Sequence, residues 1–152
     1  MSLQQWLDNS WIKRTESSIE EVMSLLDIAA REIGDGSVEG LSLEGRFTHA
    51  YNAVRILCEV ALHAEGYSVP KGGREHERTI DSLKFTLGGE WSEQVDYFDQ
   101  CRRRRHQSLY ERSGITREED ANDLLDAAVK LNVAIREWLK HRHADLVEED
   151  LS

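Results

Sequence analysis

Proline, alternating strand patterns and long apolar runs are scarce in this sequence of 152 residues, and each scarcity excludes a class of protein. The single proline, Pro70, argues against a proline-rich linker or a disordered chain. No β-branched stretch alternates with polar residues, so the pattern predicts no sheet. No apolar run approaches the roughly 20 residues that cross a bilayer, and the first residues lack the apolar core of a signal peptide. We therefore expect a cytoplasmic, all-α protein with no membrane segment.

Cysteine is also rare, and no CxxC pair is present. Cys58 and Cys101 stand far apart in the chain, and we expect both to be reduced residues in or near the core. A phosphate-binding glycine loop is missing too, because the glycine-rich segment Gly34–Gly40 lacks the Lys-Ser/Thr ending of a Walker motif. These absences remove the common redox and nucleotide-loop signatures.

Histidines stand four residues after glutamates in two places, Glu59/His63 and Glu137/His141. This spacing permits metal ligation in a helical bundle, but both pairs lack the second carboxylate-bearing helix of a di-metal site. The spacing is also typical of ion pairs on an exposed helix face. We interpret both as exposed helix pairs, place His141–His143 at the surface, and expect no metal site and no cofactor.

Basic residues are in the minority, with 19 Lys and Arg against 29 Asp and Glu, which gives a formal net charge of −10. A broad basic face for nucleic acid is therefore excluded. Charge is uneven, however, because the segment from Cys101 to Arg112 holds five arginines and one glutamate. Any anion-binding site must be local and geometrically defined.

Apolar residues recur at intervals of three and four along most of the chain, which predicts helices. The expected helices cover Leu3–Leu7, Ser17–Ile33, Ser42–Gly66, Glu75–Leu87, Ser92–Arg112 and a last one from Thr116 to about His143. Together they predict an antiparallel helical bundle of four long helices plus short connecting helices. We expect a single domain over residues 1–143 and an acidic, frayed tail over residues 144–152.

Local signals mark the ends of several of these helices. Ser17 or Ser18 is expected to cap the second helix, and Gly34–Gly40 to break it. Thr116 and Glu119 have the spacing of a capping box at the start of the last helix.

The segment CRRRRHQSLY, Cys101 to Tyr110, places four arginines on one predicted helix. The apolar rhythm that begins with Val95 and Phe98 continues through two of them, Arg102 and Arg105. We therefore expect Arg102 and Arg105 to face the core or a partner, and the other two arginines to face water. An inward guanidinium needs an anion, which can be an internal carboxylate such as Asp96 or Asp99, a second subunit or a bound phosphate.

Three segments resemble the HEPN domains of prokaryotes, which are small all-α bundles. They are LSLEGRFTHAYNAVRILCEVALHAEGY, REHERTIDSLKFTLG, and DQCRRRRHQSLYER followed by ITREEDANDLLDAAVKLNVAIREWL. The resemblance covers roughly Leu3 to Leu139. It implies a homodimer that works beside a nucleotidyltransferase-type antitoxin partner, in a toxin–antitoxin or phage-defence setting.

Nuclease members of that family carry an arginine, four to six intervening residues and a histidine, and cut RNA without metal. By this resemblance, Arg105 takes the arginine position, His106 the polar position after it, and Tyr110 the position of the histidine. The catalytic candidates are therefore Arg105, His106 and Tyr110, and the ligand-binding candidates are Arg102, Arg105 and Tyr110. A phenol accepts a proton poorly near neutral pH, so the altered motif favours phosphate binding over cleavage.

Three functions remain open from the sequence. The favoured one is an HEPN-like homodimer that binds a phosphate-containing ligand, RNA or a nucleotide, in a cleft between subunits. The second is a metal-independent ribonuclease with His106 in an unusual role. The third is a structural or adaptor dimer whose arginines pair with acids and bind no ligand.

Overall fold

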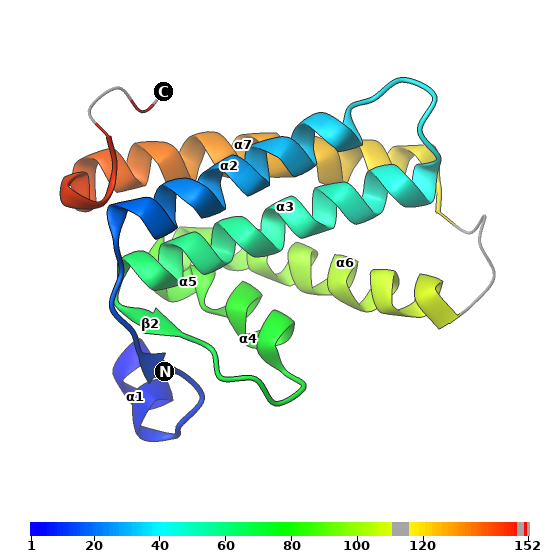
Figure 1. Cartoon of the computed structure of the whole chain (residues 1–152). Coiled ribbons are helices and arrows are strands. Elements are labelled where there is room, and N and C mark those ends of the chain that lie inside the picture. The colour runs from blue at the N-terminus through cyan, green and yellow to red at the C-terminus, as the bar shows by residue number, and fades with distance from the viewer. Residues whose placement is uncertain (111–115, 149–150, 152) are drawn as a thin grey trace.

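The computed structural model describes residues 1–110, 116–148 and 151, and for residues 106–110 it describes the backbone alone. These residues fold mainly into helix, as the sequence predicts (Figure 1). Four long helices dominate the described part of the chain: α2 (Ile19–Gly36), α3 (Leu43–Ala64), α6 (Ser92–Tyr110) and α7 (Glu118–Arg142). The shorter elements are α1 (Leu3–Asp8), β1 (Lys13–Arg14), β2 (Tyr67–Ser68), α4 (Glu75–Asp81), α5 (Leu83–Thr86) and the 3₁₀ turns η1 (Gly89–Trp91) and η2 (Ala144–Leu146).

Helix α3 is the centre of the fold. It packs closely against α2 and α7 on one side and contacts α4, α5 and α6 on the other (Figure 1). Its apolar residues are spread around most of its circumference, so burying them requires neighbours on several sides. Phe47, Tyr51 and Leu57 are all at most 2% exposed. The main core therefore forms around this helix.

Serine side chains cap the helices at their N-terminal ends. Ser18 Oγ accepts a hydrogen bond from the Glu21 backbone N–H at 3.1 Å, and Ser42 Oγ accepts one from Gly45 at 3.0 Å. Of the two predicted caps of α2, Ser18 is therefore the one used, while the Ser17 hydroxyl donates to the backbone carbonyl of His63. Each cap satisfies a backbone donor that the first turn leaves unpaired.

The predicted capping box at the start of α7 is wrong. The N-cap position falls on Arg117, one residue after Thr116, and no side chain there accepts a capping hydrogen bond. Three carboxylates occupy the first turn instead, Glu118, Glu119 and Asp120. Negative charge at this end complements the helix dipole and substitutes for the cap.

The segment Gly34–Gly40 ends α2, as predicted, but the helix continues to Gly36, three residues past the predicted Ile33. Gly36 is buried against α3, where an added Cβ would lie 3.1 Å from Cβ of His49. Its carbonyl accepts a hydrogen bond from Arg46 Nε at 3.2 Å, and the same guanidinium bonds Asn122 of α7 at 2.8 Å. The glycine therefore allows close packing against α3 at the last residue of α2.

Two further local differences lie around α4. The helix predicted over Glu75–Leu87 is divided at Ser82, whose buried hydroxyl donates to the Thr79 carbonyl at 2.6 Å. The prediction of no strand is wrong in one small place, since Lys13 and Arg14 pair antiparallel with Ser68 and Tyr67. Two residues per strand give no alternation for a pattern search to detect.

The acidic tail differs from the frayed segment that the sequence predicts. Its described residues form η2 and bury Leu146, Val147 and Leu151 to at most 9% exposure against the main core. Three apolar side chains among carboxylates are enough to hold the segment against α2 and α7. The domain therefore includes part of the tail.

The N-terminal segment forms a second, smaller core around Trp6. Trp6 is 3% exposed and packs edge-on against Trp11 and Phe85, with ring centroids 5.8 and 5.2 Å apart. Ile12 and Leu62 complete this cluster. The start of the chain is thereby attached to α3 and α5.

Replacing Leu131 by alanine should destabilise the fold strongly. Leu131 is fully buried, and its truncation leaves a cavity that costs about 2–5 kcal/mol of unfolding free energy. Val133→Ala is the control on the same helix, because Val133 is 58% exposed and should change stability by less than about 0.5 kcal/mol. Urea denaturation followed by circular dichroism measures both, and equal effects would contradict this placement of the core.

Candidate functional site

The four arginines of α6 divide as the apolar rhythm predicts. Arg102 and Arg105 are half-buried, whereas Arg103 and Arg104 are exposed. Phe98 and Cys101 on the buried side of α6 are at most 4% exposed. Helical periodicity therefore placed two guanidinium groups at the inner face of a helix.

Carboxylates in the same chain pair with three of these arginines. Asp99 accepts a hydrogen bond from Arg102 Nε at 2.9 Å and lies 3.3 Å from Arg103 Nη2. Arg104 lies 3.0 Å from Asp120 of α7. The internal carboxylate predicted for Arg102 is thus Asp99, one turn earlier on its own helix.

Arg105 reaches across to α3, where its guanidinium carbon lies 5.1 Å from the centroid of the Tyr51 ring. Tyr51 is 1% exposed, and burial raises the pKa of its phenol to about 12, against the opposing charges of Arg55 and Arg105. The phenol is therefore neutral at physiological pH. Its hydroxyl lies 3.4 Å from Nδ1 of His76 on α4.

These side chains line two hollows that share residues. A cavity of about 180 Å³ is lined by Tyr51, His76, Arg102 and Arg105, among others. A second cavity of about 370 Å³ continues past His76 to Arg55 and into the region of β2. We name this feature the arginine–histidine cleft and define it by Tyr51, Arg55, His76, Arg102 and Arg105.

Guanidinium groups lie around His76 in the cleft, and glutamates line the same two hollows. Burial lowers the pKa of His76, and the nearby charges of Arg55, Arg105 and Arg102 lower it further. The imidazole therefore stays neutral at pH 7, with one nitrogen able to donate and the other able to accept. Three guanidinium groups around a neutral imidazole form a suitable environment for a phosphate group.

Glutamates also stand at the cleft, and one of them has a structural role. The Glu75 carboxylate accepts a hydrogen bond from the Gly72 backbone N–H at 2.9 Å, and backbone donors of this kind lower its pKa. Glu77 lines the smaller cavity as well. The carboxylate of Glu75 thus holds the 69–74 loop at the mouth of the cleft.

Comparison with protein-family models, with curated proteins and with solved structures finds no match to this chain. Within residues 1–110, 116–148 and 151, no group of three or more His, Cys, Asp or Glu side chains is placed to hold a metal ion. Over the same residues, none of the helices is both long enough and apolar enough to cross a membrane.

Only part of the predicted motif can be placed. Arg102 and Arg105 lie together in the cleft, while the side chains of His106 and Tyr110 lie outside the described part of the chain. Sequence reasoning missed Tyr51 and His76, which come from two other helices. A signal did exist, because Tyr51 lies one turn before Arg55, the first of three polar residues (Arg55, Glu59 and His63) that form a strip along the second half of α3.

The polar strip of α3 continues from Arg55 to Glu59 and His63. The prediction of an exposed Glu59/His63 pair is wrong, since His63 is 8% exposed and lies 3.6 Å from Glu59 and 3.4 Å from Glu21. The contact with Glu59 raises the pKa of His63, and the contact with His63 lowers the pKa of Glu59. This pair lies at the inner end of the larger cavity.

The C-terminal histidines fit their predictions unequally. His141 is exposed and lies 3.8 Å from Glu137, as expected for a surface pair. His143 differs, because its side chain is 16% exposed, lies 3.7 Å from Glu65 and packs on the Trp138 ring. The expected surface position of His143 is therefore wrong, since the chain turns back into η2 at this point.

Replacing Glu59 by glutamine should reduce stability more at pH 5.5 than at pH 8.5. The raised pKa of His63 stabilises the fold below about pH 6.5, and this contribution is lost as pH rises through the folded value. The partial exposure of Glu59 limits the difference to about 0.5–1 kcal/mol. Urea denaturation at the two pH values measures it.

Glu137→Gln is the matched control, because it removes the carboxylate of an exposed glutamate–histidine pair with the same spacing. We expect no pH-dependent difference from the native chain. A loss of stability in Glu59→Gln that is equal at both pH values would assign the effect to Arg55, which also lies near Glu59 and does not titrate.

Proposed function

We propose that this protein binds a phosphate-containing ligand, RNA or a nucleotide, in the arginine–histidine cleft. The observation that carries the proposal is that His76 lines one hollow with Arg102 and Arg105 of α6 and the neighbouring hollow with Arg55 of α3. A chain of net charge −10 has few such places, and this one is half-buried, where a charge-assisted bond is stronger than at the surface.

The size and chemistry of the cleft support this proposal. Its two hollows, about 370 and 180 Å³, together fall in the roughly 300–1,000 Å³ range that is usual for small-molecule sites. Arginine forks bind phosphate oxygens with two parallel bonds, and Tyr51 and His76 add neutral hydrogen-bonding groups. Lys71 adds one further charge at the larger cavity.

The resemblance to HEPN domains extends the proposal to a homodimer in a toxin–antitoxin or defence system, with a nucleotidyltransferase-type antitoxin as partner. If the protein is an enzyme, the resemblance implies a ribonuclease that cuts RNA without metal. In that case Arg105, His106 and Tyr110 are the motif residues. The imidazole that lines a cavity with Arg102 and Arg105 is His76, which can act as the proton acceptor.

A structural role without ligand is the second candidate. Specific contacts favour it, because Asp99 neutralises Arg102 and Arg103, and Asp120 lies against Arg104. In that case the arginines hold α6 in place and the acidic surface binds partners. The two candidates differ in whether a ligand engages Arg105.

Arg105→Ala should weaken ligand binding by about tenfold or more, because a charge-assisted hydrogen bond contributes about 1.5–3 kcal/mol. Fluorescence anisotropy with a fluorescein-labelled single-stranded RNA, and titration with ATP, measure the effect. Arg103→Ala is the matched control, since it removes one charge from the same helix at an exposed side chain and should change affinity by less than about twofold.

Arg105→Lys separates charge from geometry, since lysine keeps the charge but lacks the planar fork. We expect an affinity between those of the native chain and Arg105→Ala. Circular dichroism must show the native helix content in each variant. Equal binding by the native chain and Arg105→Ala, with no ligand raising the melting temperature, would favour the structural role.

A further inference from the structure

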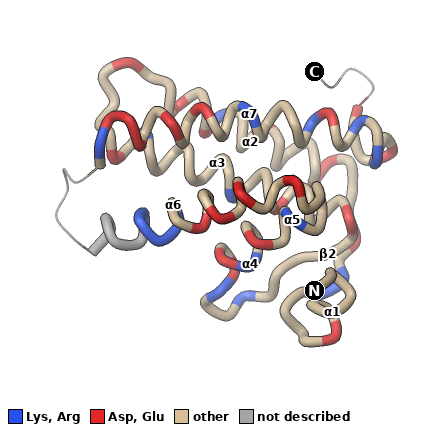
Figure 2. The backbone as a smooth tube through the Cα atoms, turned by 180° about the vertical axis from the view of Figure 1, so that it is seen from behind, with Lys and Arg blue, Asp and Glu red and all other residues tan. Residues whose placement is uncertain are grey.

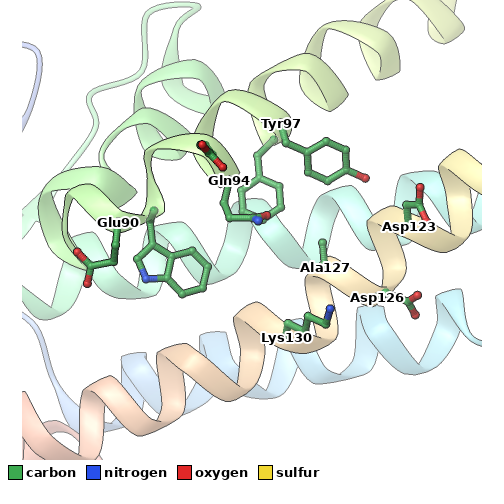
Figure 3. A pocket seen from close by; sticks show the side chains of 10 residues that line it. Glu90, Gln94, Tyr97, Asp123, Asp126, Ala127 and Lys130 are labelled. Atoms are coloured by element: carbon green, nitrogen blue, oxygen red, sulfur yellow. The ribbon is translucent and has the colours of Figure 1, made fainter.

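A larger groove lies between η1 and the first half of α6 on one side and α7 on the other (Figure 3). Its volume is about 750 Å³. The groove forms because α6 packs against α3 and α4, whereas its backbone has few contacts with α7. None of its lining residues belongs to the arginine–histidine cleft.

Apolar and aromatic side chains form the floor of the groove. Trp91, Tyr97 and Phe98 line it from η1 and α6, and Ala127 lines it from α7. Trp91 and Tyr97 are only partly buried, so their rings are available to a ligand. Ring faces of this kind attract guanidinium and ammonium groups.

Exposed valines extend this apolar surface along α7. Val129 and Val133 are 44% and 58% exposed and are among the most exposed large apolar side chains of the described residues. Val133 follows Asp126, a lining residue, by seven positions, so the two share a face of α7. The apolar strip is therefore longer than a small molecule needs and suits an extended or helical peptide.

Carboxylates form the rim. Glu90 of η1 and Glu93 of α6 line one side, and Asp123 and Asp126 of α7 line the other. Lys130 is the basic residue among the described lining residues, and Figure 3 labels it with Glu90, Asp123 and Asp126. Among the described residues, none of these four acids lies within 4.0 Å of a basic side chain. Their charge is therefore available to an incoming cation.

We propose that this groove binds a basic amphipathic segment of a partner protein. Arginine or lysine side chains of the partner lie against the four carboxylates, and its apolar side chains lie over Trp91, Tyr97 and the valine strip. Helices with one apolar and one charged face commonly dock in grooves of this form. A second copy of this chain is a poorer occupant, because its net charge of −10 makes most of its surface acidic.

The experiment uses a fluorescein-labelled amphipathic peptide of about 15 residues, with arginines on one face and leucines on the other. Fluorescence anisotropy gives its affinity for the full chain. Asp123→Asn combined with Asp126→Asn should weaken binding by about fivefold, because two rim charges are lost without a change in side-chain volume. Both aspartates are exposed on α7, so the fold should be unaffected.

Asp27→Asn combined with Asp35→Asn is the matched control. It removes the same charge from two exposed aspartates of α2, neither of which lines the groove. We expect less than about a twofold change, since long-range charge effects are largely screened at physiological salt. An equal loss in both double variants would overturn the proposal, because the attraction would then be bulk electrostatics.

Two further measurements identify the occupant. Trp91→Ala should lower the affinity for the peptide. A peptide with glutamine in place of arginine should bind the native chain poorly. Spermine that displaces the peptide and binds as tightly would instead indicate a small-cation site. Sedimentation showing that the peptide dissociates a dimer of the chain would indicate a second copy as the occupant, and either result overturns the proposal.

Discussion

The burial of α3 on several sides is the constraint on which the rest of the structure depends. A helix whose apolar residues cover most of its circumference leaves room for polar groups along one strip only. On α3 that strip holds Arg55, Glu59 and His63, spaced one turn apart. Charged groups in such a position need partners or water, because an isolated buried charge is costly. The strip therefore pairs its own residues at one end and opens into the arginine–histidine cleft at the other.

Helix α6 is packed mainly against α3 and α4 and has few backbone contacts with α7, although Arg104 pairs with Asp120 of that helix. The charge of α6 is divided along its length, with acidic residues in the first half and arginines in the second (Figure 2). Each half consequently borders a hollow of its own sign, the acidic groove near Glu93 and the cleft near Arg105. One helix thus borders two hollows of different charge, which is why the two proposals name ligands of opposite charge.

The periodicity of apolar residues predicted those features of the fold that depend on local sequence. The position of α3, the predominance of helix and the inward direction of Arg102 and Arg105 all follow from a 3.6-residue repeat. Periodicity was insufficient where distant segments meet. Helix α2 runs to Gly36, against which His49 and Arg46 pack, and Leu151 is buried because the tail folds back on the core. Tertiary contacts of this kind override local signals.

The arginine–histidine cleft could not be predicted from the sequence for the same reason. Tyr51, His76 and Arg105 come from three helices, and only the packing of α4 and α6 against α3 brings them together. In the sequence, His76 is one residue of the first turn of a helix. Only in the folded chain do burial and three neighbouring guanidinium groups lower its pKa. A motif search that reads residues along one helix cannot detect such a group.

The Arg102–Asp99 pair decides how strongly the cleft can hold an anion. Asp99 receives the Nε donor of Arg102, but a guanidinium carries five N–H donors, so one carboxylate does not exhaust it. The pair also fixes the side chain in advance, which reduces the entropy lost when a ligand binds. Asp99 repels an incoming phosphate, however, and partly cancels the attraction of Arg102. Arg55 also has a carboxylate neighbour, Glu59, at 3.9 Å. The net attraction of the cleft for an anion therefore depends on the N–H donors that such internal pairs leave available.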